Sequence, residues 1–295
     1  LTVAPSSALL SLQTAVLVTA PPAKAGDYAD AAWLVRDYAI SVVPSVRAFV
    51  DLRKVAGVSR PDSGFIGIGN PNFTANIAAA KQGGSDDVCA ERRNLRAVVA
   101  KLPALPETAQ EIKTMAGEIG GKNTKLLLGN AATKSALQAL PLDKAEIVAF
   151  ATHGLLPDDL LCESEPALAL TPGRESAADD DGLLKASDVT ALRMNASLVI
   201  LSACNTAGAD GRLGGESLSG LVRAFFFAGS RNILATHWPI ASQPTVQLTV
   251  GAIKAARKQH DDWAEGLREV KLQMLHNPQT AHPFFWGAFA LIGAG

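Results

Sequence analysis

Short apolar runs rich in β-branched residues alternate along this chain with longer segments of helical period. This alternation is typical of βα units built around a mostly parallel sheet. The expected strands cover residues 9–18, 64–68, 125–128, 146–151, 198–202, 232–236 and 285–292. The expected helices cover residues 44–55, 107–119, 134–139, 217–228, 243–259 and 263–275. The predicted fold class is therefore α/β.

Size and charge narrow the classes of protein that fit. The chain has 295 residues, and 48% of them are hydrophobic, so it can bury a large core. It carries 27 basic and 28 acidic residues, which leaves no basic excess of the kind that binds nucleic acid. We expect no nucleic-acid partner. We expect one compact unit over residues 1–295, with residues 1–100 as a smaller N-terminal lobe within it.

The first 23 residues carry no charged side chain and end near Ala23-Lys24-Ala25, as a signal peptide would. The stretch has no basic start, however, and its proline, serine, threonine and glutamine residues make it too polar to span a bilayer. We therefore expect a core strand pair within residues 9–18 and no membrane partner. A chain that begins at Leu1 also suggests a fragment of a longer protein.

The chain has three cysteines, Cys89, Cys162 and Cys204. They are too few and too scattered for a disulfide framework or a CxxC-type zinc site. A reducing compartment or a reactive thiol explains them best, so we expect a cytoplasmic protein with no metal and no cofactor.

Two of the expected strands end in residues that can carry chemistry. The run 147–151 is followed by Thr152-His153-Gly154, and the run 198–201 by Ser202-Ala203-Cys204-Asn205. Ligands of an open parallel sheet bind beyond the carboxyl ends of its strands. If these two strands are neighbours, His153 and Cys204 emerge side by side. An imidazole next to a thiol is what a cysteine nucleophile requires.

Gly154 completes this arrangement. A residue without a Cβ atom permits close approach of a substrate, and its N–H together with that of Cys204 can hold a tetrahedral oxyanion. The histidine precedes the cysteine by 51 positions, close to the spacing in caspases. These residues alone leave a second interpretation open, because an unpaired cysteine is more often a small buried hydrophobe than a nucleophile.

The motifs Thr152-His153-Gly154 and Ser202-Ala203-Cys204-Asn205-Thr206 do not stand alone. Further matching stretches lie at residues 38–41, 44–45, 69–73, 143–151, 164–170, 181–184, 198–201, 207–229, 236–239 and 282–287. Together they resemble the CHAT domain, the caspase-HetF-associated-with-TPR family. The resemblance implies a caspase-like three-layer sandwich, a dyad of His153 and Cys204, fusion to upstream tetratricopeptide (TPR) repeats, and a bacterial source.

The substrate pocket is less defined. Relatives resembling clostripain carry an acidic residue two places before the nucleophile, which binds a basic P1 side chain, whereas this chain has Ser202. A preference for Arg or Lys therefore does not follow. The acidic candidates that remain are Asp181, Asp210 and Glu216. His237 and Trp238 follow another strand and either form a wall of the cleft or pack as an ordinary core pair.

The other histidines and motifs are better explained without catalysis. His282 and Trp286 lie in a run that we interpret as a buried aromatic strand. His260 and His276 are expected at solvated helix ends. No Gly-x-Ser-x-Gly elbow of an α/β-hydrolase occurs. The sequence therefore predicts a cysteine endopeptidase that cleaves a protein or peptide. The alternative is a latent or non-catalytic interaction module regulated by an upstream repeat domain.

Overall fold

The computed structural model describes residues 1–5, 9, 12–22, 24, 26–55, 63–76, 95–157, 160, 164–174, 180–202 and 220–295. Over these residues the central sheet runs in the order β1 (Thr2–Val3), β2 (Ser41–Val42), β11 (Phe289–Gly293), β10 (Asn232–Thr236), β9 (Leu198–Leu201), β5 (Ile147–Ala151), β3 (Phe65–Pro71), β4 (Lys125–Gly129). Neighbouring strands are parallel except β10 and β11. The predicted mostly parallel sheet is confirmed.

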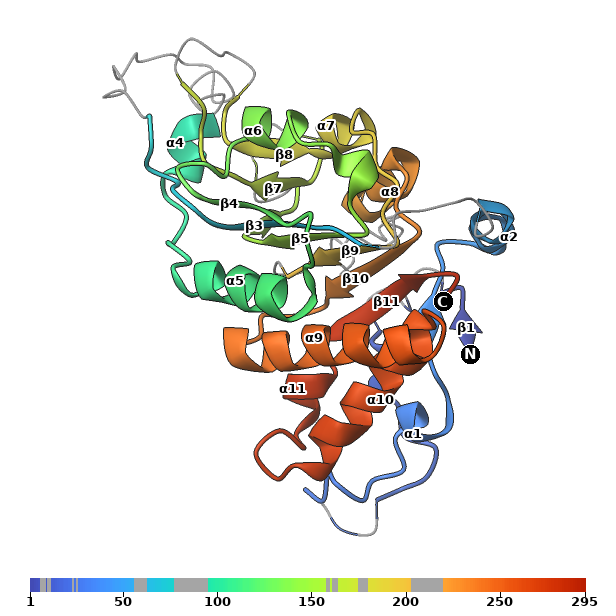
Figure 1. Ribbon diagram of the computed structural model, residues 1–295. Coiled ribbons are helices and arrows are strands. Elements are labelled where there is room, and N and C mark those ends of the chain that lie inside the picture. The colour runs from blue at the N-terminus through green and yellow to red at the C-terminus, as the bar shows by residue number, and fades with distance from the viewer. Residues whose placement is uncertain are drawn as a thin grey trace.

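Helices cover both faces of this sheet (Figure 1). One layer contains α5 (Glu107–Ile119), α9 (Ser242–Lys258) and α10 (Trp263–His276), and the other contains α6 (Lys134–Gln138), α7 (Ala186–Thr190) and α8 (Gly220–Ala228). Side chains alternate along β5, so that Ile147 and Ala149 join the core of the first layer while Val148 and Phe150 join the second. An alternation with period two over fully buried strands gives a three-layer sandwich, as predicted.

A smaller antiparallel sheet lies beside the second layer. It consists of β6 (Gly154–Leu155), β7 (Ala167–Ala169) and β8 (Leu183–Lys185). Together with α4 (Leu95–Val99) and Phe73, it forms a separate hydrophobic cluster. These strands were not predicted, because two or three residues are too short to show a period.

The predicted strand pair within residues 9–18 is wrong over the part that the structure describes. Thr14–Val16 is a short 3-10 helix, η2, and Val18 makes a single bridge to Trp33. The cause is Gln13, whose Oε1 accepts from the N–H of Ala15 while its Nε2 donates to the carbonyl of Phe289 at 3.1 Å. The segment therefore attaches to the sheet through a side chain rather than through a strand ladder.

The predicted strand over 285–292 begins only at Phe289. Its first part is the short helix α11 (Pro283–Trp286), which starts at a proline and is capped by His282, whose Nδ1 accepts from the N–H of Phe284. Proline at the first helical position favours a helix start. Of the aromatic run, Trp286 is fully buried but Phe284 is 44% exposed, so only part of it belongs to the core.

The remaining predicted elements are confirmed with small shifts of their ends. β3, β4, β5, β9 and β10 lie where strands were expected, and α5, α6, α8, α9, α10 and α2 (Val46–Val55) where helices were expected. Among the described residues, the helices α1 (Leu34–Asp37) and α4, the 3-10 helix η3 (Leu142–Lys144) and the strands β1 and β2 were not predicted either. A smaller lobe over residues 1–100 stays a prediction, although β1, β2 and β3 are strands of the central sheet.

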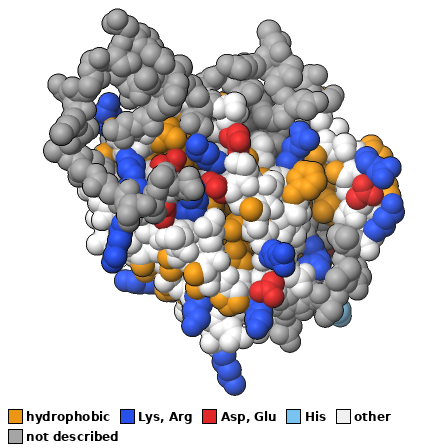
Figure 2. Space-filling model, turned by 90° about the horizontal axis from the view of Figure 1, so that it is seen from above, with side chains coloured by type: hydrophobic (Ala, Val, Ile, Leu, Met, Phe, Trp, Pro, Cys, Tyr) orange, Lys and Arg blue, Asp and Glu red, His pale blue; other side chains and the backbone are white. Residues whose placement is uncertain are grey.

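The surface above the second helix layer carries charges of both signs. Figure 2 shows Lys and Arg side chains on this face among Asp, Glu and hydrophobic side chains. Among the described residues, no helix combines the length and the apolar character that crossing a bilayer requires.

Candidate active site

Three parallel strands of the central sheet, β5, β9 and β10, end at the same edge. Phe150 of β5 pairs with Leu201 of β9, and Leu201 pairs in turn with Ala235 of β10. The N–H of Ser202 extends the ladder by one bond, donating to the carbonyl of Phe150 at 2.9 Å. The strands that precede His153 and Cys204 are therefore neighbours, which meets the condition set in the sequence analysis.

His153 lies between β5 and β6, half-buried. Its Nε2 contacts the carbonyl oxygen of Pro103 at 2.8 Å, and its ring lies 5.4 Å from that of Phe73. A carbonyl oxygen only accepts hydrogen bonds, so Nε2 carries the proton and Nδ1 is the nitrogen with a lone pair. The segment before α5 thereby fixes the tautomer of His153.

The main chain around His153 is held by one residue of β7. The N–H of Ala169 donates to the carbonyl of His153 at 2.9 Å. The carbonyl of Ala169 accepts from the buried hydroxyl of Thr152 at 2.5 Å. Gly154, half-buried, follows as the first residue of β6 and pairs with Leu168. His153 and Gly154 therefore stand at a rigid junction between the large sheet and the small one.

Several predicted site residues lie outside the described residues. These are Cys204, Asp210 and Glu216, and also the two other cysteines, Cys89 and Cys162. Their roles stay predictions.

Asp181, a predicted pocket residue, is already engaged within its own turn. Its Oδ1 accepts from the N–H of Leu183 at 2.9 Å, and its Oδ2 lies 3.9 Å from Nζ of Lys185. Burial nevertheless raises the pKa of Asp181, although the Leu183 hydrogen bond and the nearby lysines oppose this. These contacts stabilise the start of β8, and a pocket role for Asp181 stays a prediction.

His237 and Trp238 follow β10 at the same edge and are partly buried. The N–H of His237 donates to the carbonyl of Ala288 at 2.8 Å, and Nε1 of Trp238 donates to the carbonyl of Phe284 at 3.0 Å. Burial lowers the pKa of His237 to about 4, and the charge of Lys271 adds to this shift. His237 is therefore neutral at physiological pH. Its main chain is bonded to the segment after α11, and the indole of Trp238 is bonded to α11 itself.

Comparison with known proteins identifies the family. The CHAT domain family matches residues 1–294. This chain belongs to the CHAT domain family. Tetratricopeptide repeat protein 28 of Mus musculus is 28% identical over 224 residues, which cover 63% of this chain and 8% of that protein. The Homo sapiens protein of the same name is 25% identical over the same shares.

The CHAT domain thus spans 8% of the length of these two relatives, which come from mouse and human, and a bacterial source stays a prediction. A chain of the Saccharomyces cerevisiae separase–securin complex matches 88% of this chain with 10% identity and a TM-score of 0.47, covering 14% of that chain. A second structure of the same complex gives 11% identity and a TM-score of 0.45. The predicted α/β sandwich with a mostly parallel central sheet is the fold of this CHAT domain.

The structure adds to this edge of the CHAT domain one residue that the sequence analysis missed. Glu111 of α5 is 3% exposed, and burial raises its pKa to about 7 against the hydrogen bonds of Ser202 and Ser242, which lower it. A signal for it exists in the sequence. Glu111 shares the buried stripe of α5 with Thr108, Ile112, Met115 and Ile119, a spacing that places an acid on an apolar face.

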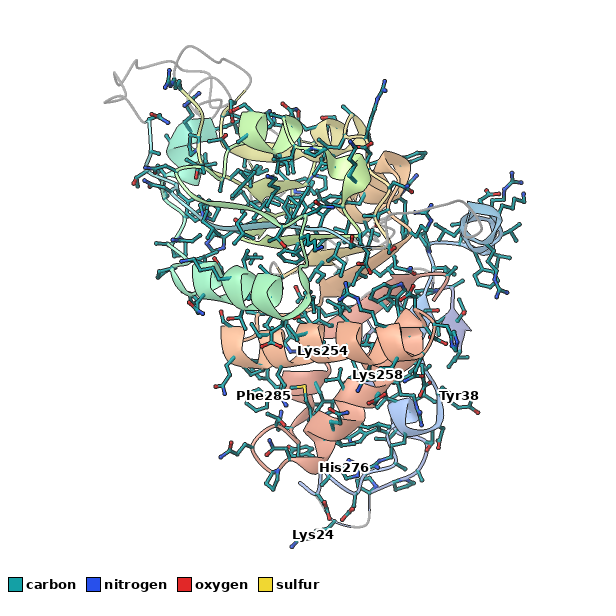
Figure 3. All side chains as sticks on the ribbon, in the orientation of Figure 1. Lys24, Tyr38, Lys254, Lys258, His276 and Phe285 are labelled. Atoms are coloured by element: carbon teal, nitrogen blue, oxygen red, sulfur yellow. The ribbon has the colours of Figure 1, made fainter. Side chains whose placement is uncertain are left out.

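The other histidines and the aromatic residues of the CHAT domain behave as non-catalytic groups. His260 and His276 are exposed near helix ends, and Figure 3 shows His276 at the end of α10, away from the central sheet. Trp286 is a core residue, and its ring packs 5.3 Å from that of Trp33. Within the described ranges, no group of three His, Cys, Asp or Glu side chains could hold a metal ion.

Proposed function

We propose that this CHAT domain is a caspase-like cysteine endopeptidase that hydrolyses peptide bonds in a protein substrate. The observation that carries the proposal is the register of β5 against β9, in which Phe150 pairs with Leu201. His153 stands three residues after Phe150, and Cys204 stands three residues after Leu201. Because the two residues follow paired positions of parallel strands by the same number of residues, this register favours a short distance between the imidazole of His153 and the thiol of Cys204.

The tautomer of His153 determines which nitrogen would act. Because Nε2–H donates to the carbonyl of Pro103, Nδ1 is the nitrogen that would take the thiol proton of Cys204. The thiolate would then attack the carbonyl carbon of the scissile bond. The imidazolium would return the proton to the leaving amine, and a water molecule would hydrolyse the resulting thioester.

Stabilisation of the oxyanion belongs to the same proposal. The N–H groups of Gly154 and Cys204 are the proposed donors, and the missing Cβ of Gly154 would let the scissile carbonyl approach the main chain. Ala169 bonds to the main-chain carbonyl of His153 and to the side-chain hydroxyl of Thr152, which supports a preorganised donor at the next residue, Gly154.

The proposed substrate is a protein segment without a fixed requirement for a basic P1 side chain. The residue two places before the nucleophile is Ser202, which carries no charge. Asp210, Glu216, His237 and Trp238 remain proposed pocket residues, and His237 would contribute a neutral ring. The two relatives named for tetratricopeptide repeats support a repeat region in the same protein as a regulatory partner. A cytoplasmic setting stays a prediction.

Peptide cleavage tests the proposal directly. The protein, a Cys204→Ala variant and a matched Cys89→Ala variant would be incubated with a diverse peptide library, and new termini would be identified by mass spectrometry. We expect cleavage by the wild type and by Cys89→Ala, and none by Cys204→Ala. The residue before each new terminus would give the P1 preference.

A second outcome would favour the alternative function. If the wild type produces no new termini and iodoacetamide alkylates Cys204 no faster than Cys89, the domain is a latent or purely binding module. Adding a repeat region from the full-length protein would then test whether its partner activates the peptidase.

A further inference from the structure

Phe73 lies just after β3, at the same edge of the sheet as His153, because Gly69 of β3 pairs with Ala151 of β5. Its side chain is 4% exposed and belongs to the small hydrophobic cluster beside β7 and β8. Its ring centroid lies 5.4 Å from that of His153, and the two ring planes meet at 39°. Aromatic rings attract each other at this distance. The imidazole of His153 therefore rests against a buried phenyl ring.

The hydrogen bond to Pro103 alone leaves the plane of the His153 imidazole undetermined. Nε2 donates to the carbonyl of Pro103 at 2.8 Å, which fixes the tautomer and the place of one ring atom. The ring can still turn about its Cβ–Cγ bond, because a torsion between sp³ and sp² atoms has broad minima. Nε2 lies close to the axis of this turn, whereas Nδ1 lies farther from it. A second contact, with the ring itself, is needed to fix the direction of Nδ1.

The main chain on both sides of Phe73 is held by side-chain hydrogen bonds. The N–H of Asn72 donates to the hydroxyl oxygen of Thr171 at 2.8 Å, and Nδ2 of Asn72 donates to Oδ1 of Asn130 at 2.7 Å. Oδ1 of Asn72 accepts from the N–H of Thr74 at 3.2 Å. Asn72 therefore bonds outward to the segments that follow β7 and β4, and also across Phe73 to the next residue. A ring on such a segment is a fixed support.

The small hydrophobic cluster also holds the other groups that contact His153. Leu102 and Leu105 lie on either side of Pro103 in the sequence, and both pack against the cluster. Ala169, whose N–H donates to the carbonyl of His153, is a member of it. Close-packed side chains keep their positions relative to one another. The phenyl ring, the carbonyl acceptor and the main-chain donor are therefore parts of one packed unit around the imidazole.

We propose that Phe73 is a positioning residue whose ring sets the plane of the His153 imidazole and thereby the direction of Nδ1. The inference rests on the proposed function, because Nδ1 is the nitrogen that would take the thiol proton of Cys204. Leucine in place of Phe73 would keep the cluster apolar but would leave the imidazole free to turn. A displacement of about 1 Å at a reacting group can cost on the order of a hundredfold in rate. A ring that turns freely is correctly placed for part of the time, so the expected loss is smaller.

The first measurement is the mobility of the His153 ring, from ¹³C relaxation of protein labelled at histidine. Its signal is assigned by its absence from His153→Gln. Phe73→Leu is compared with the matched control Phe65→Leu, which removes a ring that is 1% exposed at the other end of β3. We expect an order parameter of about 0.85 in the wild type and in Phe65→Leu, and a value below about 0.6 in Phe73→Leu.

The second measurement is kcat and KM for the best library peptide. For Phe73→Leu we expect kcat to fall about tenfold with KM nearly unchanged, whereas Phe65→Leu should keep both constants. Phe73→Tyr keeps the ring, so its kcat should lie within about twofold of the wild type. Melting curves of all variants separate a loss of rate from a loss of folded protein.

Asn72→Ala replaces Phe73→Leu if the latter does not fold. It keeps the phenyl ring but removes the side chain that bonds to Asn130 and Thr74, so it should lower both the order parameter of His153 and kcat. An unchanged order parameter of His153 in the folded variant would overturn the inference, as would a kcat of Phe73→Tyr as low as that of Phe73→Leu. If the wild type cleaves no peptide, the proposed function fails, and the relaxation measurement alone decides whether Phe73 fixes the ring.

Discussion

At the scale of single residues, the two histidines at the sheet edge differ in their surroundings. His237 has its pKa lowered to about 4, chiefly by burial, whereas His153 has a fixed tautomer at a half-buried junction. The folded pKa of His237 lies below that of the unfolded chain, so the unfolded state binds more protons between about pH 4 and 6.5. The stability that neutral His237 contributes is present above pH 6.5 and is lost as the pH falls through about 4.

We therefore expect His237→Gln to gain stability relative to the wild type as the pH falls. The gain should reach about 2–3 kcal/mol near pH 4.5 and vanish at pH 7.5, as measured by melting temperatures in a pH series. His276→Gln, at an exposed helix end, serves as the control and should track the wild type throughout. A constant difference between His237→Gln and the wild type at all pH values would contradict the prediction.

The sequence predicted part of this site for a physical reason. His153, Ser202 and His237 follow strongly apolar strands, and parallel strands place such residues at one edge whatever the loops do. Glu111 and Pro103 belong to another element, and their contacts with the edge depend on how α5 packs on the sheet. No local pattern shows which strands elsewhere in the chain the side chains of α5 will contact, although an acid on an apolar stripe is a usable signal.

At the scale of elements, the packing of α5 on β3 requires a residue without a Cβ atom in β3. A Cβ at Gly69 would lie 2.9 Å from Cγ1 of Ile112 and 2.9 Å from the carbonyl oxygen of Thr108. The second contact is with main chain, so α5 would have to move. We expect Gly69→Ala to lower the free energy of unfolding by about 1–3 kcal/mol, measured by denaturant titration.

Gly117→Ala on the same helix is the matched control. Nothing lies within 4 Å of a Cβ at Gly117, which is exposed. Alanine has the higher helix propensity, so this variant should be more stable by about 0.5–1 kcal/mol. Equal effects of the two substitutions would show that α5 is not seated on β3 through Gly69.

The elements that the sequence predicted are those with a long enough period. α5 and α9 show several turns of apolar spacing, β5 is a five-residue apolar run, and β10 has three apolar residues between Asn232 and Thr236, so all four were found. The short strands β6, β7 and β8 form because they pair with one another and cover Phe73, a long-range effect that two or three residues cannot display. The predicted strand pair within residues 9–18 was wrong for the same reason, since the long-range hydrogen bond of one glutamine side chain, Gln13, determines how this segment attaches to the sheet.

At the scale of the whole molecule, one buried lysine sets the pH range of greatest stability. Lys271 of α10 is 3% exposed, and its Nζ donates to the carbonyl of Phe289 at 2.7 Å, where Gln13 also donates. Burial lowers the pKa of Lys271 to about 7. Between pH 7 and 10.5 the unfolded chain binds more protons than the folded chain, so stability rises with pH over this range.

Below pH 7 the two other shifted groups near the sheet oppose each other. The raised pKa of Glu111 makes its contribution fall as the pH rises from about 4.5 to 7, while the lowered pKa of His237 makes its contribution rise over nearly the same range. The rise above pH 7 therefore belongs to Lys271. We expect the melting temperature at pH 9 to exceed that at pH 7 by on the order of 5 °C.

Lys271→Met should abolish this rise and increase stability at pH 7, because the carbonyl of Phe289 keeps Gln13 as a donor while the buried ammonium is removed. Lys258→Met is the matched control, since Lys258 is exposed at the end of α9 (Figure 3), and it should keep the slope of the wild type. If the melting temperature of the wild type is flat from pH 7 to 9, Lys271 is protonated in the folded protein across that range. The core between α10 and β11 would then hold a charged ammonium, and stability would depend on partners beyond Phe289.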